Sequence, residues 1–180
     1  MRIMSSRSRM LPSRRGLVSG ALVLPALMLG QTRSLAAGAP SDAEMIDNLT
    51  KNREAFDELV AMVRADRRLE RVDDTWTRPT NPATIGVTPE RITLYRTKMA
   101  ALGIARGFSA FRPDGAIFFL VYAEGTTVNG RGKSYVWSET GDFSESSMEA
   151  DLDPLWATRR RRVYAFRKVD GPWFLHMNSY

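Results

Sequence analysis

The sequence has no cysteine and a single histidine, His176, among its 180 residues. Without cysteine the chain can form no disulfide bond and can offer no thiolate to a metal or a substrate. A zinc site would need two or three further strong ligands that carboxylates alone would have to supply, and a Ser–His–Asp system would have to use His176. No motif therefore specifies a reaction, and we expect no bound metal or cofactor.

Acidic residues are missing from the first 36 residues, which contain six arginines. These six arginines account for the whole formal charge of +6, because the remaining chain balances 20 basic residues against 20 acidic ones. Binding to the phosphate backbone of a nucleic acid needs a sustained basic surface. The charge balance beyond residue 36 therefore argues against a nucleic-acid-binding protein.

Residues 1–36 have the order of a secretory signal peptide. A charged start is followed by the apolar run Leu17–Leu29 and then by small residues from Ser34 onward. The run is shorter than the roughly 20 apolar residues that span a bilayer, and it contains Pro25, so we expect no membrane span. We expect cleavage after Ala36 and one domain over residues 37–180.

The paired arginines Arg14 and Arg15 suggest the route of export. Ser13–Val18 resembles the start of twin-arginine signals, so we expect the twin-arginine export machinery to be a partner during transport. An ordinary Sec signal with two chance arginines is the alternative. The protein would then be periplasmic or secreted, and Met1, Met4 or Met10 could each be the true start.

Two helices are predicted after the signal. Ser41–Glu44 fits a capping box, and apolar residues then recur at three- and four-residue steps, which predicts a helix over 42–67. Thr88–Glu90 offers an N-cap, a proline at the first helical position and an acidic residue, and Gly103 suits a C-cap. The second helix is therefore predicted over 89–102.

The segment 69–87 between these helices breaks the helical pattern. Pro79 and Pro82 bias their preceding residues away from helical conformations. We expect an extended connection over the surface, held to the core by Trp76 and Ile85.

Beyond Gly103 the apolar period changes from about 3.6 residues to two, which is typical of strands. The most apolar stretch, 116–123, predicts the central strand. Further strands are expected over 104–111, 133–138, 161–169 and 173–178. The order predicts an α+β fold in which two N-terminal helices pack on a four- to five-stranded antiparallel sheet.

Several segments resemble a functionally uncharacterised family of small exported proteins and lipoproteins of proteobacteria. They are Glu54–Val60, Gly86–Arg91, Lys133–Trp137, Asp151–Asp153 and Tyr164–Leu175. Many members of that family look like lipoproteins, whereas this chain lacks the cysteine that would be acylated. The resemblance implies a location in the cell envelope and this order of elements, and it implies no activity or catalytic residue.

A basic run follows an acidic stretch late in the chain. The acidic residues of 142–153 lack the spacing and the glycine of an EF-hand loop, so they do not predict a calcium site. Arg159, Arg160, Arg161 and Arg162 follow, with Trp156 beside them. The simplest interpretation is a solvated, self-complementary surface. The alternative is a recognition surface for a small anionic ligand or an envelope protein, because guanidinium groups bind carboxylates and phosphates bidentately.

Strand alternation places Phe174, His176 and Asn178 on one face of the last strand. We expect this strand to lie at an edge of the sheet and His176 to be a partly exposed structural residue. The leading hypothesis is a non-catalytic binding or accessory protein of the cell envelope. The alternatives are an envelope hydrolase that uses carboxylates or His176, and an inhibitor or partner of an envelope enzyme.

The export hypothesis predicts the effect of replacing both Arg14 and Arg15 with lysine. Twin-arginine recognition depends on the arginines themselves, so the double variant should stay uncleaved in the cytoplasm. Cell fractionation and the intact mass of the exported wild-type protein, which should begin at Ala37, check this expectation. Normal export of the variant would instead identify a Sec signal.

Overall fold

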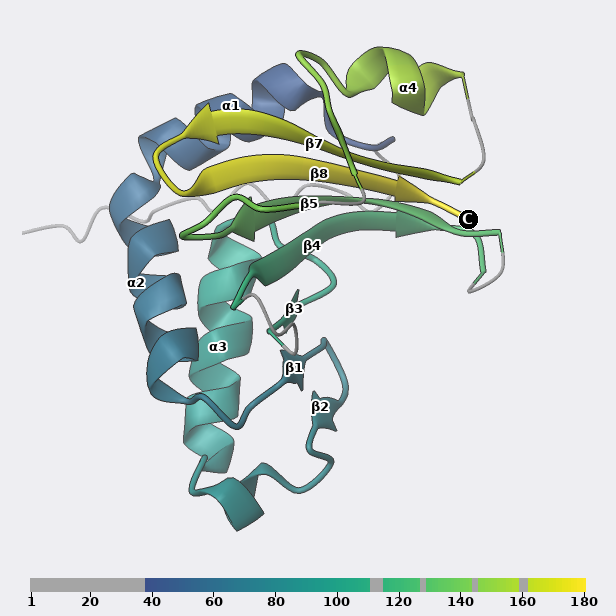
Figure 1. Ribbon diagram of the computed structural model, residues 1–180. Coiled ribbons are helices and arrows are strands. Elements are labelled where there is room, and N and C mark those ends of the chain that lie inside the picture. Colours follow the sequence, from purple (N-terminus) through teal and green to yellow (C-terminus); the bar gives the residue numbers. More distant parts are fainter. Residues whose placement is uncertain (1–37, 111–114, 127–128, 144–145, 159–161) are drawn as a thin grey trace, which may run out of the picture. The chain divides into compact units, whose positions relative to one another are not determined.

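The computed structural model describes residues 38–180, apart from 111–114, 127–128, 144–145 and 159–161. The predicted signal peptide, with Arg14 and Arg15, lies outside these residues. The described residues form helices and a single sheet whose strands follow mainly in the second half of the chain (Figure 1). The α+β class predicted from the sequence is therefore confirmed.

The helices differ from the two that were predicted. In the described residues they are α1 Asp42–Lys51, α2 Arg53–Ala65, α3 Pro89–Ala101 and the short α4 Asp153–Ala157, with a 3-10 turn, η1, at Pro82–Ile85. The single helix expected over 42–67 is interrupted at Asn52, whose φ of −116° and ψ of 25° leave the helical region. The Asn52 side chain bonds the Asn48 carbonyl, and the Asn48 amide in turn donates to the Leu102 carbonyl, so these two asparagines turn the chain between α1 and α2.

The predicted capping signals at the starts of α1 and α3 and at the end of α3 are confirmed. The Ser41 hydroxyl accepts the Glu44 N–H at 3.2 Å, and the Glu44 carboxylate accepts the Ser41 N–H at 2.9 Å, which completes the capping box of α1. Thr88 caps α3 by accepting the Arg91 N–H. At the other end of α3, Gly103 adopts a φ of 71° and Ile104 donates to the Met99 carbonyl.

The sheet is larger than predicted and is not wholly antiparallel. Its eight described strands lie in the order β2-β1-β3-β4-β5-β8-β7-β6. Their bounds are β1 Arg71–Val72, β2 Thr77–Arg78, β3 Phe108–Ser109, β4 Ile117–Glu124, β5 Arg131–Trp137, β6 Ser147–Met148, β7 Val163–Asp170 and β8 Trp173–Ser179. All described neighbours pair antiparallel except β6 with β7, which pair parallel. The prediction of four to five antiparallel strands is therefore wrong.

The additional strands come from segments in which no strand was predicted. β1 and β2 form a small hairpin within 69–87, and β6 lies within the polar stretch after β5. Each of these strands has two residues, which is too short for an alternating pattern to be recognised. The predicted core contact of Trp76 is also wrong: its side chain is 46% exposed, while Ile85 does pack on the core.

The main core lies between α1, α2 and α3 and one face of the sheet (Figure 1). Alternate residues of the long strands contribute to it, such as Phe119, Tyr135 and Trp173. Phe56 of α2 meets Tyr135 and Trp173 edge to face, with ring centroids 4.8 and 5.5 Å apart. The helices are therefore held by aromatic contacts near the middle of the sheet, and we call this side the helix face.

The opposite side, which we call the open face, has a second and smaller apolar cluster. It consists of Ala116, Val136, Phe143, Phe166 and Phe174, with Phe118 and Tyr164 packed against it. The Phe143 ring, from the chain after β5, stacks on Phe166 at 3.7 Å. This segment thus covers one part of the open face.

Gly107 allows the close approach of β3 to β1, and this predicts a measurable requirement for glycine. Its φ is 82°, and an added Cβ would lie 1.9 Å from the Val72 carbonyl oxygen. Gly103, with a φ of 71° and open space around it, is the matched control. We expect Gly103→Ala to cost about 1 kcal/mol through its backbone conformation alone. Gly107→Ala should cost about 1–3 kcal/mol more, through the clash with β1. Urea unfolding checks this difference, and equal losses would contradict it.

Candidate functional site

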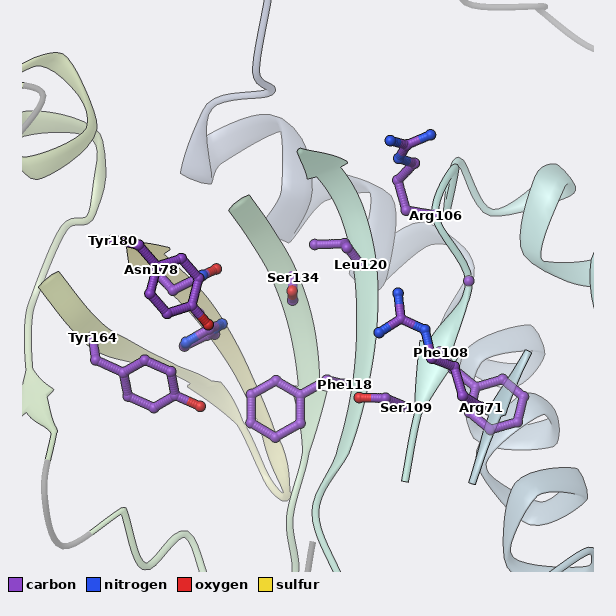
Figure 2. Close-up of a pocket in the computed structure, with 12 residues that line it drawn as sticks. Arg71, Arg106, Phe108, Ser109, Phe118, Leu120, Ser134, Tyr164, Asn178 and Tyr180 are labelled. Carbon is purple, nitrogen blue, oxygen red and sulfur yellow. The ribbon is translucent and has the colours of Figure 1, made fainter. Parts of the chain in front are cut away.

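A pocket of about 230 Å³ lies on the open face (Figure 2). It extends across six neighbouring strands of the sheet, in the order β1, β3, β4, β5, β8 and β7. Its lining is Arg71, Arg106, Gly107, Phe108, Ser109, Phe118, Leu120, Ser134, Tyr164, His176, Asn178 and Tyr180. Two of these residues are basic, and none is acidic. The volume suits a ligand smaller than a typical drug molecule.

The strand register explains why residues so far apart in sequence line one pocket. Arg71 of β1 is opposite Ser109 of β3, and Ser109 is opposite Phe118 of β4. Residues directly opposite each other in antiparallel strands point to the same face. The ladder of β5 and β8 likewise sets Ser134 opposite His176. The pocket is therefore built mainly from side chains that alternate with those of the core, although Phe108 belongs to both.

Arg71 forms the charged end of the pocket. Its Nη2 donates to Asp73 Oδ2 at 2.8 Å, and its guanidinium lies over the Trp76 ring at 4.8 Å from the centroid. Its Nε is buried and makes no hydrogen bond to a described residue. In Figure 2 the guanidinium points from β1 toward β3 and β4. The ion pair and the ring hold this cation in place while leaving further N–H groups for an acceptor.

Asp73, which holds Arg71, is itself fixed. It is 7% exposed, and its Oδ1 accepts the Asp74 N–H at 2.9 Å. Burial acts to raise the pKa of Asp73, but its hydrogen bonds with Asp74 and Arg71 outweigh burial and lower that pKa below its ordinary value. Asp73 is therefore a carboxylate at neutral pH and a permanent partner of Arg71.

Arg106 lies at the rim of the same pocket. Its backbone N–H donates to the Leu120 carbonyl at 3.0 Å, which ties the start of this segment to β4. Figure 2 shows its guanidinium turned away from the other labelled side chains. No carboxylate of the described residues pairs with it. Arg106 therefore adds positive potential at the rim without lining the centre as Arg71 does.

The other end of the pocket is aromatic. The His176 ring lies 4.5 Å from the Tyr164 ring and 5.2 Å from the Phe118 ring, measured between centroids. The predicted face of His176 is confirmed, but its predicted exposure is wrong, because it is 4% exposed. β8 lies between β5 and β7 rather than at the edge of the sheet, so His176 is flanked by a neighbouring strand on each side.

The predicted recognition surface is only partly described. Arg159, Arg160 and Arg161 lie outside the described residues. Arg162 is exposed, has a φ of 56° and precedes β7, two residues before Tyr164 of the pocket. The arginine run as a whole therefore stays a prediction.

Trp156 lies on α4 and packs against the main core. The Arg131 guanidinium stands over its ring at 3.9 Å, and Arg131 Nη1 donates to the Trp156 carbonyl. The Tyr122 ring meets it edge to face at 5.7 Å. Trp156 therefore anchors α4 to the ends of β4 and β5, and it does not line the pocket.

A buried ion cluster is the other concentration of charge. Lys133 and Asp42, each 1% exposed, pair at 3.0 Å, and Lys133 also contacts Asp153 of α4. Arg167 of β7 donates to Asp42 Oδ2 at 2.9 Å, and the Leu152 N–H donates to the same oxygen at 2.8 Å. The cluster thus joins α1, α4, β5 and β7.

The carboxylates of Asp42, Asp151 and Asp153 lie within 4.8 Å of one another, close enough to share a cation. The ammonium of Lys133 and the guanidinium of Arg167 already contact them. These side chains supply the positive charge that a metal ion would otherwise bring. We therefore interpret the cluster as structural.

No protein-family model, curated protein or solved structure matches this chain. Within the described residues, no helix has the length and apolar character needed to cross a bilayer. The geometry of the pocket is therefore the main indication of what the protein does.

Sequence reasoning missed the pocket for a specific reason. Arg71 lies in the segment predicted to be an extended connection, and Ser109 and Ser134 are ordinary polar residues of predicted strands. Alternation indicated a polar face, but the order of the strands was needed to bring these residues together.

Asp42 is the residue through which the ion cluster can be tested. Burial acts to raise the pKa of Asp42, but hydrogen bonds from Leu152, Arg167 and Lys133 outweigh it and lower that pKa. At pH 7 we expect Asp42→Asn to cost about 3 kcal/mol, because Lys133 loses its buried anionic partner. The difference in unfolding free energy between the wild type and Asp42→Asn should shrink as the pH falls below about 3.9, the ordinary pKa of an unfolded aspartate. Over this range the wild-type Asp42 also becomes protonated, as the pH passes through its lower pKa in the folded protein.

Asp47→Asn is the control, since Asp47 forms an exposed pair with Lys51 at 2.7 Å. It should cost at most about 0.5 kcal/mol. Urea unfolding as a function of pH measures both variants. Equal losses, or a difference that does not change with pH, would contradict the structural role of the cluster.

Proposed function

We propose that this is an exported, non-catalytic binding protein of the cell envelope, which holds a small anionic ligand in the pocket on the open face. The observation that carries the proposal is the lining: a fixed arginine, a second arginine at the rim, hydroxyl and amide groups, aromatic rings and no carboxylate among the lining residues. Its export rests on the signal-like sequence of residues 1–36.

The chemistry of the lining favours an anion over a cation or a neutral sugar. Arg71 offers N–H groups in a planar fork, which matches the oxygens of a carboxylate or phosphate. Ser109, Ser134 and Asn178 add neutral donors. Asp73 neutralises part of the Arg71 charge but is not itself a lining residue. An anion would thus meet hydrogen-bond donors without facing a carboxylate.

Binding is tested with a panel of small anions, namely acetate, benzoate, phenylacetate, phenyl phosphate and inorganic phosphate. In amide NMR titrations we expect shift changes confined to β1, β3, the first half of β4 and the end of β8. Arg71→Gln should weaken binding of the best anion by about tenfold or more, because a charged hydrogen bond is lost. Arg67→Gln, which removes the same charge from an exposed site outside the pocket, should leave affinity unchanged.

Two results would contradict the proposal. One is the absence of binding by every anion of the panel, and the other is equal loss of affinity in the Arg71 and Arg67 variants. The second would indicate an effect of net charge rather than a pocket. Thermal unfolding of both variants establishes that they are folded.

A hydrolase is the second candidate, because Ser134 and His176 face each other across β5 and β8 and both line the pocket. Both side chains are almost fully buried, at 3% and 4% exposure, and the lining provides no carboxylate to orient the imidazole. These features favour binding over catalysis. Hydrolysis of p-nitrophenyl acetate that is lost in His176→Ala would reverse this preference.

A further inference from the structure

Three side chains on the open face form a row of cation, hydroxyl and aromatic ring. They are Arg71 on β1, Ser109 on β3 and Phe118 on β4, joined by the pairs Arg71–Ser109 and Ser109–Phe118. All three line the pocket. Neighbouring strands are about 4.8 Å apart, so roughly 10 Å separates the backbones that carry the cation and the ring.

The row gives the pocket a direction. Figure 2 shows the Arg71 side chain directed toward β4, with the Phe118 ring on the side of the row away from Arg71. The ring of Tyr164 lies at the far side of Phe118 in the same view. A ligand that lies along the row would therefore meet charge at one end and aromatic surface at the other.

We infer that the pocket binds a short arylcarboxylate, with its carboxylate at Arg71 and Ser109 and its ring against Phe118. This inference rests on the proposed function and names the class of ligand. The Arg71 guanidinium keeps Nε and Nη1 without a hydrogen bond to a described residue, and the Ser109 hydroxyl stands beside it in the row. The Arg71 guanidinium and the Ser109 hydroxyl would thus supply the donors for the two oxygens of one carboxylate.

The aromatic end of the pocket is the reason why we expect a ligand with a ring to bind more tightly than a simple anion. Phe118 packs in the open-face cluster, near the rings of Phe166 and His176 at 6.2 and 5.2 Å. A ligand ring in offset or edge contact with Phe118 would extend this set of aromatic contacts and leave water. Acetate and phosphate can use the arginine but gain nothing from this surface.

The test compares phenylacetate with acetate, inorganic phosphate and 2-phenylethylamine by calorimetric titration of the purified protein. Phenylacetate should bind at least about tenfold more tightly than acetate, because it also buries a ring. The amine carries the same ring on a positively charged chain. It should bind weakest, because the Arg71 guanidinium repels its ammonium group.

Two variants test the two ends of the row separately, and a third serves as a control. Arg71→Lys keeps the charge but loses the planar fork, and it should weaken phenylacetate binding by about tenfold. Phe118→Leu keeps an apolar side chain, and it should weaken phenylacetate binding by about threefold or more with no change for acetate. Arg78→Lys is the matched control: Arg78 is opposite Arg71 on β2, pairs with Glu70 at 2.8 Å and does not line the pocket.

The outcomes separate this inference from the proposed function. If acetate or phosphate binds as tightly as phenylacetate and still depends on Arg71, the anion pocket stands and the arylcarboxylate inference is overturned. If no anion binds, both are overturned. Equal effects of Arg71→Lys and Arg78→Lys would also overturn the inference, because the row would then have no special role.

Discussion

The strict alternation of side chains along β5 and β8 is the constraint on which the rest of the structure depends. Trp173, Leu175 and Met177 are buried beneath the helices. Their packing leaves Phe174, His176 and Asn178 no position but the open face. A slip of one residue would move the core residues into the pocket and the pocket residues into the core. The hydrophobic core therefore fixes the chemistry of the open face.

The ion cluster supports the same arrangement from the helix face. Lys133 lies on β5 with Tyr135 and Trp137, and its charged end meets Asp42 at the start of α1. A buried ammonium needs anionic partners in defined positions, which makes this contact less tolerant of sliding than an apolar one. The cluster thus fixes where α1 begins on the sheet, at the first turn after the segment expected to be cleaved.

Local signals in the sequence were sufficient for the long elements. Capping residues such as Ser41 and Thr88, the apolar run of β4 and the period-two alternation of β8 act over a few residues, so a sequence alone reveals them. Asn52 was harder to interpret, because asparagine is only weakly unfavourable in a helix and its effect here depends on a contact between Asn48 and Leu102. The hairpin of β1 and β2 depends on pairing with β3, a contact that no local pattern encodes.

The candidate site shows the same limit. Alternation correctly assigned His176 to a face, but its burial depends on β7 and β5 lying on either side of β8. The polar residues of the pocket come from strands that adjoin only in three dimensions. Their types carry no signal by themselves, since serine and asparagine are mostly exposed in proteins whatever their role.

The helix face also controls the geometry of the pocket through the hairpin. Arg96 of α3 donates from its Nε to the Asp73 carbonyl oxygen at 3.0 Å, and the Asp73 carboxylate holds Arg71. Gly107 lets β3 approach the Val72 carbonyl closely, which sets Ser109 beside Arg71. The donors at the charged end are therefore positioned by contacts that a ligand does not have to form. Because this order is present before any binding, an anion bound as we propose would cost the protein little side-chain entropy, and a small ligand would need only few contacts.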